Sequence, residues 1–234
     1  LLSEAIDKCG DEYLLHYNLG LSYFKSRNLK MAINHLRKAI EVDTTHASSF
    51  LLYAYALNDD DKWIQSFLAF HFFLFLEPNT DRSKDAFSEM YDMLLTEHPP
   101  GSGKLQPDSG IDQQKMYEYI QQHKPTVDTP EAQYIFFQDI TKRVFLTLNQ
   151  LQADSRKGLL WDFFVPIYSE ILASGYVDVY CRYVSVSYFP ASLDWWNSHT
   201  AEVDKFIQWF EEGQGGDYDD GELEFGDDSE DDDL

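Results

Sequence analysis

A pattern of small and large apolar residues recurs in this chain at a step of about 34 residues, the period of a helical-hairpin repeat. The first copy contains Leu19-Gly20, Tyr23, Ala32, Leu36 and Ala39. The second copy contains, one step later, Tyr53-Ala54, Leu57, Ser66, Phe70 and Phe73. Small residues recur where two helices must touch, and large residues recur where a core must be filled. A period of this length is typical of solenoids built from helical hairpins, so the step constrains the fold more than any other feature.

The first copy resembles the tetratricopeptide repeat, a family whose pattern runs aromatic residue, Leu-Gly, Tyr, Ala, aromatic residue, Ala and Pro at fixed spacing. The matching positions are Leu19, Gly20, Tyr23, Ala32 and Ala39. The departures are at His16, Leu36 and Thr44, where the family usually has Trp, an aromatic residue and Pro. The resemblance implies an all-α fold, a right-handed solenoid of helical hairpins. It also implies a concave groove, lined by the first helices of successive repeats, that receives a peptide or a helix of a partner.

The resemblance covers residues 1–98. Complete repeats are expected at 13–46 and 47–80, with helical hairpins over 13–25 and 29–41, and over 47–57 and 62–76. The second copy keeps Phe50, Phe70 and Pro78 but lacks the Gly and one Ala. A half repeat is expected at 1–12, through Leu2 and Ala5, and a partial third repeat at 81–98, through Phe87, Ser88 and Tyr91. A chain that begins half-way through a repeat is expected to be a fragment of a longer solenoid or a processed product.

Residues 112–212 are predicted to be a divergent helical region without a family resemblance. A loop at 99–111, rich in Pro, Gly and Ser, separates this region from the repeats. Further helices are expected at 112–123, 129–152, 155–174 and 191–211. Thr129-Pro130-Glu131 and Ser192 are the predicted start signals of two of them. Tyr176–Tyr188 alternates like a strand but also fits one face of a helix, and the helical context favours the helix.

The second helix of the second copy, residues 63–76, is apolar nearly all round. It is too short to span a bilayer, which requires about 20 residues. A helix without a polar face is normally buried on every side. Neighbouring repeats cover only part of it, so the C-terminal region is expected to pack on the repeats and cover the face of Phe67, His71 and Leu74. The turn before this helix contains Asp61, which is expected to cap it.

The net charge of −23 is concentrated at the C-terminus, where residues 211–234 hold 13 acidic side chains and no Lys or Arg. Such a tail, from 213 onward, is predicted to be disordered, because it cannot bury enough surface to offset its ordering entropy. It is expected either to engage a basic partner or only to keep the protein soluble. The acidic balance argues against nucleic acid as a partner. Cys9 and Cys181 do not have the spacing of a metal site or a redox motif. They therefore leave the cellular compartment of the protein undecided, with the cytoplasm slightly favoured.

Motifs for chemistry are weak in this sequence, and no cofactor, metal or catalytic residue is expected. Gly101–Lys104 lacks the upstream Gly and the following Ser or Thr of a phosphate-binding loop. Asp217–Gly221 lacks the first ligands of a calcium loop. A lone His71 in an apolar helix is typical of a core residue. The alternative function is that of an enzyme or of a protein that binds a small molecule or carbohydrate, with a site among Trp161, Asp162, Tyr168, Glu170, Trp195, Trp196 and His199.

The favoured function is that of a non-catalytic interaction or scaffold module that binds a protein or peptide, with no membrane span and an open oligomeric state. The predicted groove residues are Leu14, Tyr17, Leu21, Phe24, Leu51 and Tyr55. This face is apolar and aromatic, as in grooves that hold a partner through aromatic anchors. It lacks the Lys, Arg and Asn that the carboxylate-binding members of the family place there. The same residues would equally suit packing against the chain's own C-terminal helices, and both interpretations stay open.

Overall fold

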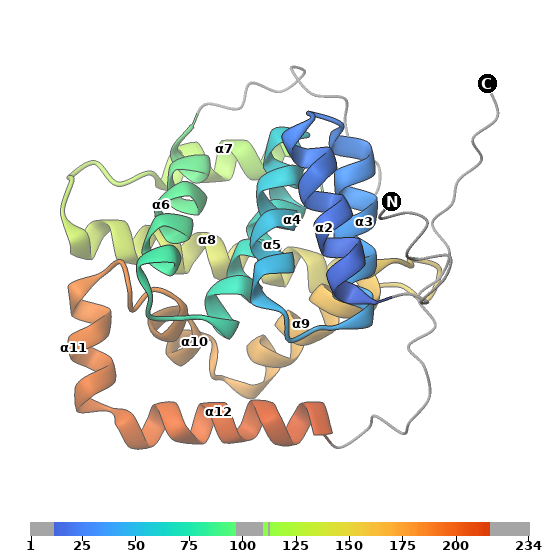
Figure 1. Ribbon diagram of the computed structural model, residues 1–234. Coiled ribbons are helices and arrows are strands. Elements are labelled where there is room, and N and C mark those ends of the chain that lie inside the picture. Colours follow the sequence, from blue (N-terminus) through green and yellow to red (C-terminus); the bar gives the residue numbers. More distant parts are fainter. Residues whose placement is uncertain (1–11, 97–109, 112, 216–234) are drawn as a thin grey trace. The chain divides into compact units, whose positions relative to one another are not determined.

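The computed structural model describes residues 12–96, 110–111 and 113–215. Every regular element among these residues is a helix (Figure 1). None of these helices combines the length and the apolar character needed to cross a membrane. Residues 1–11 of the expected half repeat, most of the expected loop, the motif candidates at 101–104 and 217–221 and the acidic tail from 216 lie outside the described residues. The chain divides into two compact units, Leu1–Lys124 and Pro125–Leu234.

Helices α2 to α6 of the first unit follow the repeat step found in the sequence, and α7 lies outside it (Figure 1). Their bounds are α2 (Tyr13–Lys25), α3 (Leu29–Val42), α4 (Ala47–Asp59), α5 (Trp63–Leu76), α6 (Asp81–Leu95) and α7 (Gln113–His123). Helices α4 and α5 begin and end one full step after α2 and α3, and α6 begins one full step after α4. The two predicted helical hairpins are therefore confirmed.

The turn inside each hairpin is built in the same way in both copies. Arg27 and Asp61 have positive φ angles of 63° and 59°. The next residue donates its N–H to a carbonyl five positions back, Asn28 to Tyr23 at 3.0 Å and Lys62 to Leu57 at 2.9 Å. This is the Schellman arrangement that ends a helix. The prediction that Asp61 caps α5 is wrong, because its backbone closes α4 and Lys62 is the N-cap residue.

The small residues of the pattern lie where the two helices of a hairpin meet. A Cβ atom on Gly20 would lie only 2.6 Å from Cγ of Leu36, whose side chain is fully buried. At the equivalent place in the second hairpin, Ser66 donates its hydroxyl to the carbonyl of Ala54 at 2.8 Å. The close approach of backbones is therefore kept by Gly in one hairpin and by a buried hydrogen bond in the other.

Helix α5 is the most buried element of the first unit. Phe67, Phe70, His71, Phe73 and Leu74 have no exposed surface. Within the unit α5 packs against α4 and α6. That the C-terminal half covers its outer face stays a prediction.

The second unit contains five α-helices and one π-helical turn among its described residues. Their bounds are α8 (Pro130–Leu151), η1 (Leu160–Phe164), α9 (Val165–Ser174), α10 (Val177–Val184), α11 (Pro190–Ser198) and α12 (Thr200–Gly215). Thr129 caps α8 as predicted, accepting a hydrogen bond from the N–H of Ala132 at 3.3 Å. Helix α10 confirms the helical interpretation of the segment that also alternates like a strand.

Three predicted boundaries in this unit are wrong. The helix expected from 155 begins later, because Gly158 takes a positive φ of 92° and donates its N–H to the carboxylate of Asp162 at 2.7 Å. Ser192 caps nothing, because it lies buried within α11 with its hydroxyl 2.9 Å from that of Ser185. Helix α12 also continues to Gly215, past the expected start of the tail at 213.

The helix expected over 191–211 is interrupted at His199, where α11 turns into α12 (Figure 1). The hydroxyl of Ser198 donates to the carbonyls of Asp194 and Trp195, and Nδ1 of His199 lies 2.9 Å from the latter carbonyl. These side chains compete with backbone N–H groups for the carbonyls of the last turn. The carbonyl of His199 then accepts from the N–H of Val203 at 3.1 Å, and a new helix begins.

Candidate functional site

The candidate site is the outward face of α2, α4 and α6, the first helices of the successive hairpins. Positions spaced three and four apart lie on one face of a helix. The repeat step then aligns equivalent positions of α2, α4 and α6 in four rows, each with one residue from each helix. The rows are Leu14, Ser48 and Arg82; Tyr17, Leu51 and Asp85; Leu21, Tyr55 and Glu89; and Phe24, Asn58 and Asp92. We call this surface the first-helix face.

The six predicted groove residues keep access to solvent. Leu14 is 47% exposed, and Tyr17, Leu21, Phe24, Leu51 and Tyr55 are half-buried. The ring of Tyr55 packs edge-on against Phe70 of the second helix of its own hairpin, with centroids 5.3 Å apart. These side chains therefore rest on the repeat core without being part of it.

His46, the N-cap residue of α4, joins the faces of α2 and α4. Its ring centroid lies 5.0 Å from those of both Tyr13 and Tyr17. Its Nδ1 lies 2.8 Å from the hydroxyl of Ser49. Burial lowers the pKa of His46, the negative charge of Asp43 opposes that effect, and the positive charge of Arg82 adds to it. His46 was not predicted from the sequence, although it stands directly before the second repeat.

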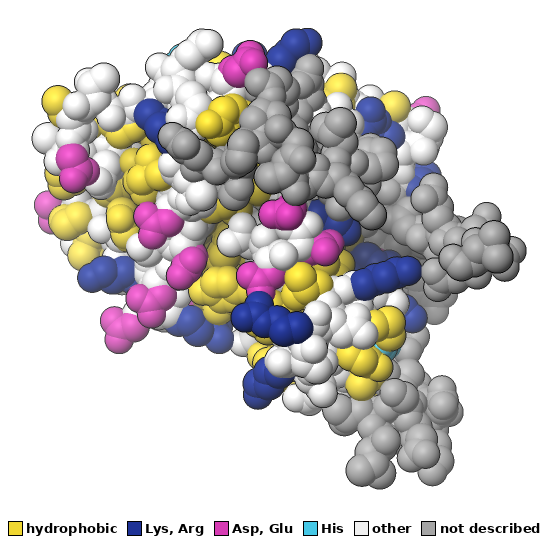
Figure 2. Space-filling model, turned by 90° about the horizontal axis from the view of Figure 1, so that it is seen from above, with side chains coloured by type: hydrophobic (Ala, Val, Ile, Leu, Met, Phe, Trp, Pro, Cys, Tyr) yellow, Lys and Arg dark blue, Asp and Glu magenta, His cyan; other side chains and the backbone are white. Residues whose placement is uncertain are grey.

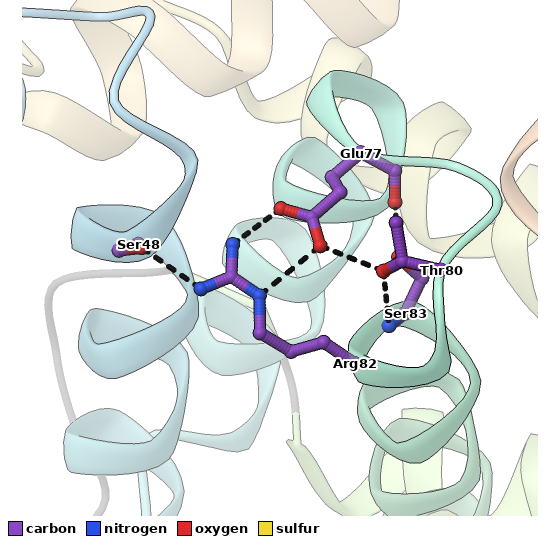
Figure 3. Close-up of polar contacts among 5 residues, drawn as sticks. All are labelled: Ser48, Glu77, Thr80, Arg82 and Ser83. Carbon is purple, nitrogen blue, oxygen red and sulfur yellow. Dashed lines mark hydrogen bonds and ion pairs between the residues drawn. The ribbon is translucent and has the colours of Figure 1, made fainter.

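Arg82 joins α6 to α4 (Figure 3). Its Nη1 donates to the hydroxyl of Ser48 at 2.9 Å, and these two residues occupy equivalent positions in successive repeats. Its Nε donates to Oε1 of Glu77 at 3.1 Å, and Nη2 forms an ion pair with the other carboxylate oxygen. The guanidinium also lies over the ring of Phe73, 5.2 Å from the centroid. The hydrogen bond from Arg82 lowers the pKa of the Glu77 carboxyl.

Beyond Arg82, the α6 part of the first-helix face is acidic. Asp85, Glu89 and Asp92 all lie on the surface of the first unit. Burial raises the pKa of the Tyr55 hydroxyl, and the negative charges of Glu89 and Asp85 raise it further. These two carboxylates therefore lie near the aromatic residue of the neighbouring helix. Neither carboxylate was predicted as a site residue, although one repeat step along the sequence from Leu51 leads to Asp85 and one from Tyr55 leads to Glu89.

Comparison with known protein families supports the interpretation of the first hairpin. Residues 13–46, which contain α2 and α3, match the family model described as Tetratricopeptide repeat. The first hairpin is therefore similar to a tetratricopeptide repeat. Searches of curated proteins and of solved structures gave no match.

The residues of the alternative site are spread over three elements of the second unit. Trp161 and Tyr168, on η1 and α9, are buried, whereas Glu170 is exposed. Asp162 accepts a hydrogen bond from the backbone of Gly158 and forms an ion pair with Lys157. On α11 and its C-cap residue, Trp195 stacks on His199 with ring centroids 4.6 Å apart.

Trp196, the remaining residue of that set, stacks on Tyr183 with ring centroids 4.9 Å apart. Each of these polar side chains thus has a local structural role or faces solvent. The part of the chain that the structure describes contains no group of three or more His, Cys, Asp or Glu side chains suited to a metal ion.

Proposed function

We propose that this protein is an interaction module whose first-helix face receives a helical or extended segment of a protein partner. The tetratricopeptide repeat at 13–46 supports a role in protein binding. The observation that carries the proposal is the accessibility of the six apolar and aromatic groove residues, none of which is buried.

The contrast with α5 argues against the alternative that these side chains only fill the core. A core side chain such as Phe67 or Phe73 has no exposed surface. Leu14 and its neighbours on the first-helix face keep part of their surface exposed, and a bound partner can bury that surface. Aromatic and large apolar residues are the usual anchors of a binding surface. Tyr17 and Tyr55 are the best candidates, since each presents a rigid ring supported from behind by His46 or Phe70.

The test is the double variant Tyr17→Ser, Tyr55→Ser of the full chain, used with the wild type to capture partners from an extract of the source cells. We expect the variant to lose the captured partner while circular dichroism shows unchanged helix content. A matched control is Ile135→Ser, Leu146→Ser on α8, where the side chains are 55% and 42% exposed but lie outside the first-helix face. This control should retain capture.

Two results would contradict the proposal. Unchanged capture by the tyrosine variant would mean that the partner binds elsewhere. Loss of helix content in the tyrosine variant, with none in the α8 control, would instead show that Tyr17 and Tyr55 belong to the core.

A further inference from the structure

We propose that the occupant of the first-helix face is a basic amphipathic segment of another protein, with apolar side chains against α2 and α4 and Lys or Arg against α6. This inference rests on the proposed function and adds the chemistry of the partner. It follows from the way the same face changes along the three helices, from apolar to acidic.

The apolar half of the face is contributed by Tyr17 and Leu21 of α2 and by Leu51 and Tyr55 of α4. The acidic half is contributed by Asp85, Glu89 and Asp92 of α6, which follow the helical spacing of four and three. Arg82 bonds to Ser48 at the equivalent position of α4, and this contact holds the rows in register. Seen from above in Figure 2, the molecule has acidic side chains beside hydrophobic ones on its surface.

The acidic row is not neutralised by neighbouring cations. Among the ion pairs of the described residues none involves Asp85, Glu89 or Asp92. Arg82, the cation one row before Asp85 on this face, is paired with Glu77. Lys84 is the other cation of α6, but it is one position from Asp85 and therefore about 100° away around the helix. Carboxylates three and four apart on a helix repel one another. A segment with Lys or Arg would relieve that repulsion.

Charge also distinguishes between possible occupants. The chain's own residues 211–234 hold 13 acidic side chains and no Lys or Arg, so they would be repelled by the acidic row. A second copy of a chain with net charge −23 would be repelled as well. A basic partner segment is the occupant with complementary charge, and complementary charge favours both encounter and specificity.

The test uses two synthetic helical peptides with Leu at every third or fourth position, one with Lys and one with Glu at the remaining positions. Binding to the full chain is measured by fluorescence anisotropy at low and at physiological salt. We expect the Leu/Lys peptide to bind more tightly and to weaken as salt rises. The variant Asp85→Asn, Glu89→Gln should weaken it about threefold to tenfold, the scale of two exposed ion pairs.

The matched control is Asp204→Asn, Glu202→Gln on α12, which removes the same charge from another exposed helix. It should leave the affinity unchanged, and because both variants keep the acidic tail, attraction to the tail cancels in the comparison. Equal weakening by the two variants would overturn the inference, and so would equal binding of the Leu/Glu peptide. In either case, loss of peptide binding in Tyr17→Ser, Tyr55→Ser would leave the proposed groove standing. Sedimentation that shows self-association through this face would also overturn the inference.

Discussion

Gly20 shows, at the scale of one residue, how closely α2 and α3 approach each other. An added Cβ would lie 2.6 Å from Cγ and 2.8 Å from Cδ2 of the buried Leu36. Alanine is favoured over glycine inside a helix by about 1 kcal/mol, but overpacking a core contact costs about 1–3 kcal/mol. We therefore predict that Gly20→Ala lowers the free energy of unfolding, measured by denaturant titration.

The control for Gly20 is Gly213→Ala on α12, where an added Cβ meets nothing within 4 Å. This substitution should be neutral or stabilise by up to about 1 kcal/mol. If Gly20→Ala stabilised the protein as much as Gly213→Ala, that result would contradict the close approach of α2 and α3 at Gly20.

At the scale of an element, α6 depends on its N-terminal cap. The hydroxyl of Thr80 accepts a hydrogen bond from the N–H of Ser83 at 3.1 Å and donates to Oε1 of Glu77 at 2.7 Å (Figure 3). Replacing a capping Thr with Ala costs about 1 kcal/mol. We predict a loss of that size for Thr80→Ala in chemical unfolding, together with weaker docking of α6 because Glu77 also binds Arg82.

Thr96, at the other end of α6, is the control for that prediction. Its hydroxyl donates to the carbonyl of Asp92 at 2.8 Å, and its side chain is exposed. Thr96→Ala should therefore change the free energy of unfolding by less than about 0.5 kcal/mol. Similar losses for the two variants would mean that the cap contributes little to α6.

At the scale of the whole molecule, the buried imidazole of His71 and the partly buried imidazoles of His35 and His46 should make the fold sensitive to mild acid. Burial lowers the pKa of His71 to about 3. The pKa values of His35 and His46 are also lowered, and burial is the largest cause for both. A histidine whose pKa is lower in the folded state than in the unfolded chain takes up its proton in the unfolded chain as the pH falls, while it stays neutral in the folded state. Stability is therefore lost as the pH falls below about 6.5, the pKa in the unfolded chain.

Between pH 7 and pH 5.5 the contribution of His71 alone should be about 1 kcal/mol. The measurement is the midpoint of urea unfolding at the two pH values, for the wild type and for His71→Leu. The variant should lose less stability between the two values, because one acid-sensitive group is gone. An identical loss in both proteins would mean that His71 is protonated in the folded state.

The sequence by itself determined the repeat. The regular step and the small residues at Gly20, Ala32 and Ala54 predicted both hairpins, and α4 and α5 lie at the predicted places. Periodicity is reliable for this purpose because, in every turn of a helix, the apolar residues lie on the side that faces the core and the polar residues lie on the side that faces solvent. The predicted groove residues also lie on the first helices, where the resemblance places them. Their role in binding stays a prediction.

Only the tertiary structure decided the ends of helices and the character of the site. A short polar side chain such as Asp61 or Ser192 can cap a helix, close one or bond elsewhere, and the outcome depends on which neighbouring group is within reach. Asp61 adopts the left-handed turn that ends α4, and Ser192 pairs with Ser185. The acidic row of α6 likewise joins the site through the fold, because Asp85 and Glu89 lie one repeat step along the chain from Leu51 and Tyr55, and packing of the helices brings both carboxylates near Tyr55.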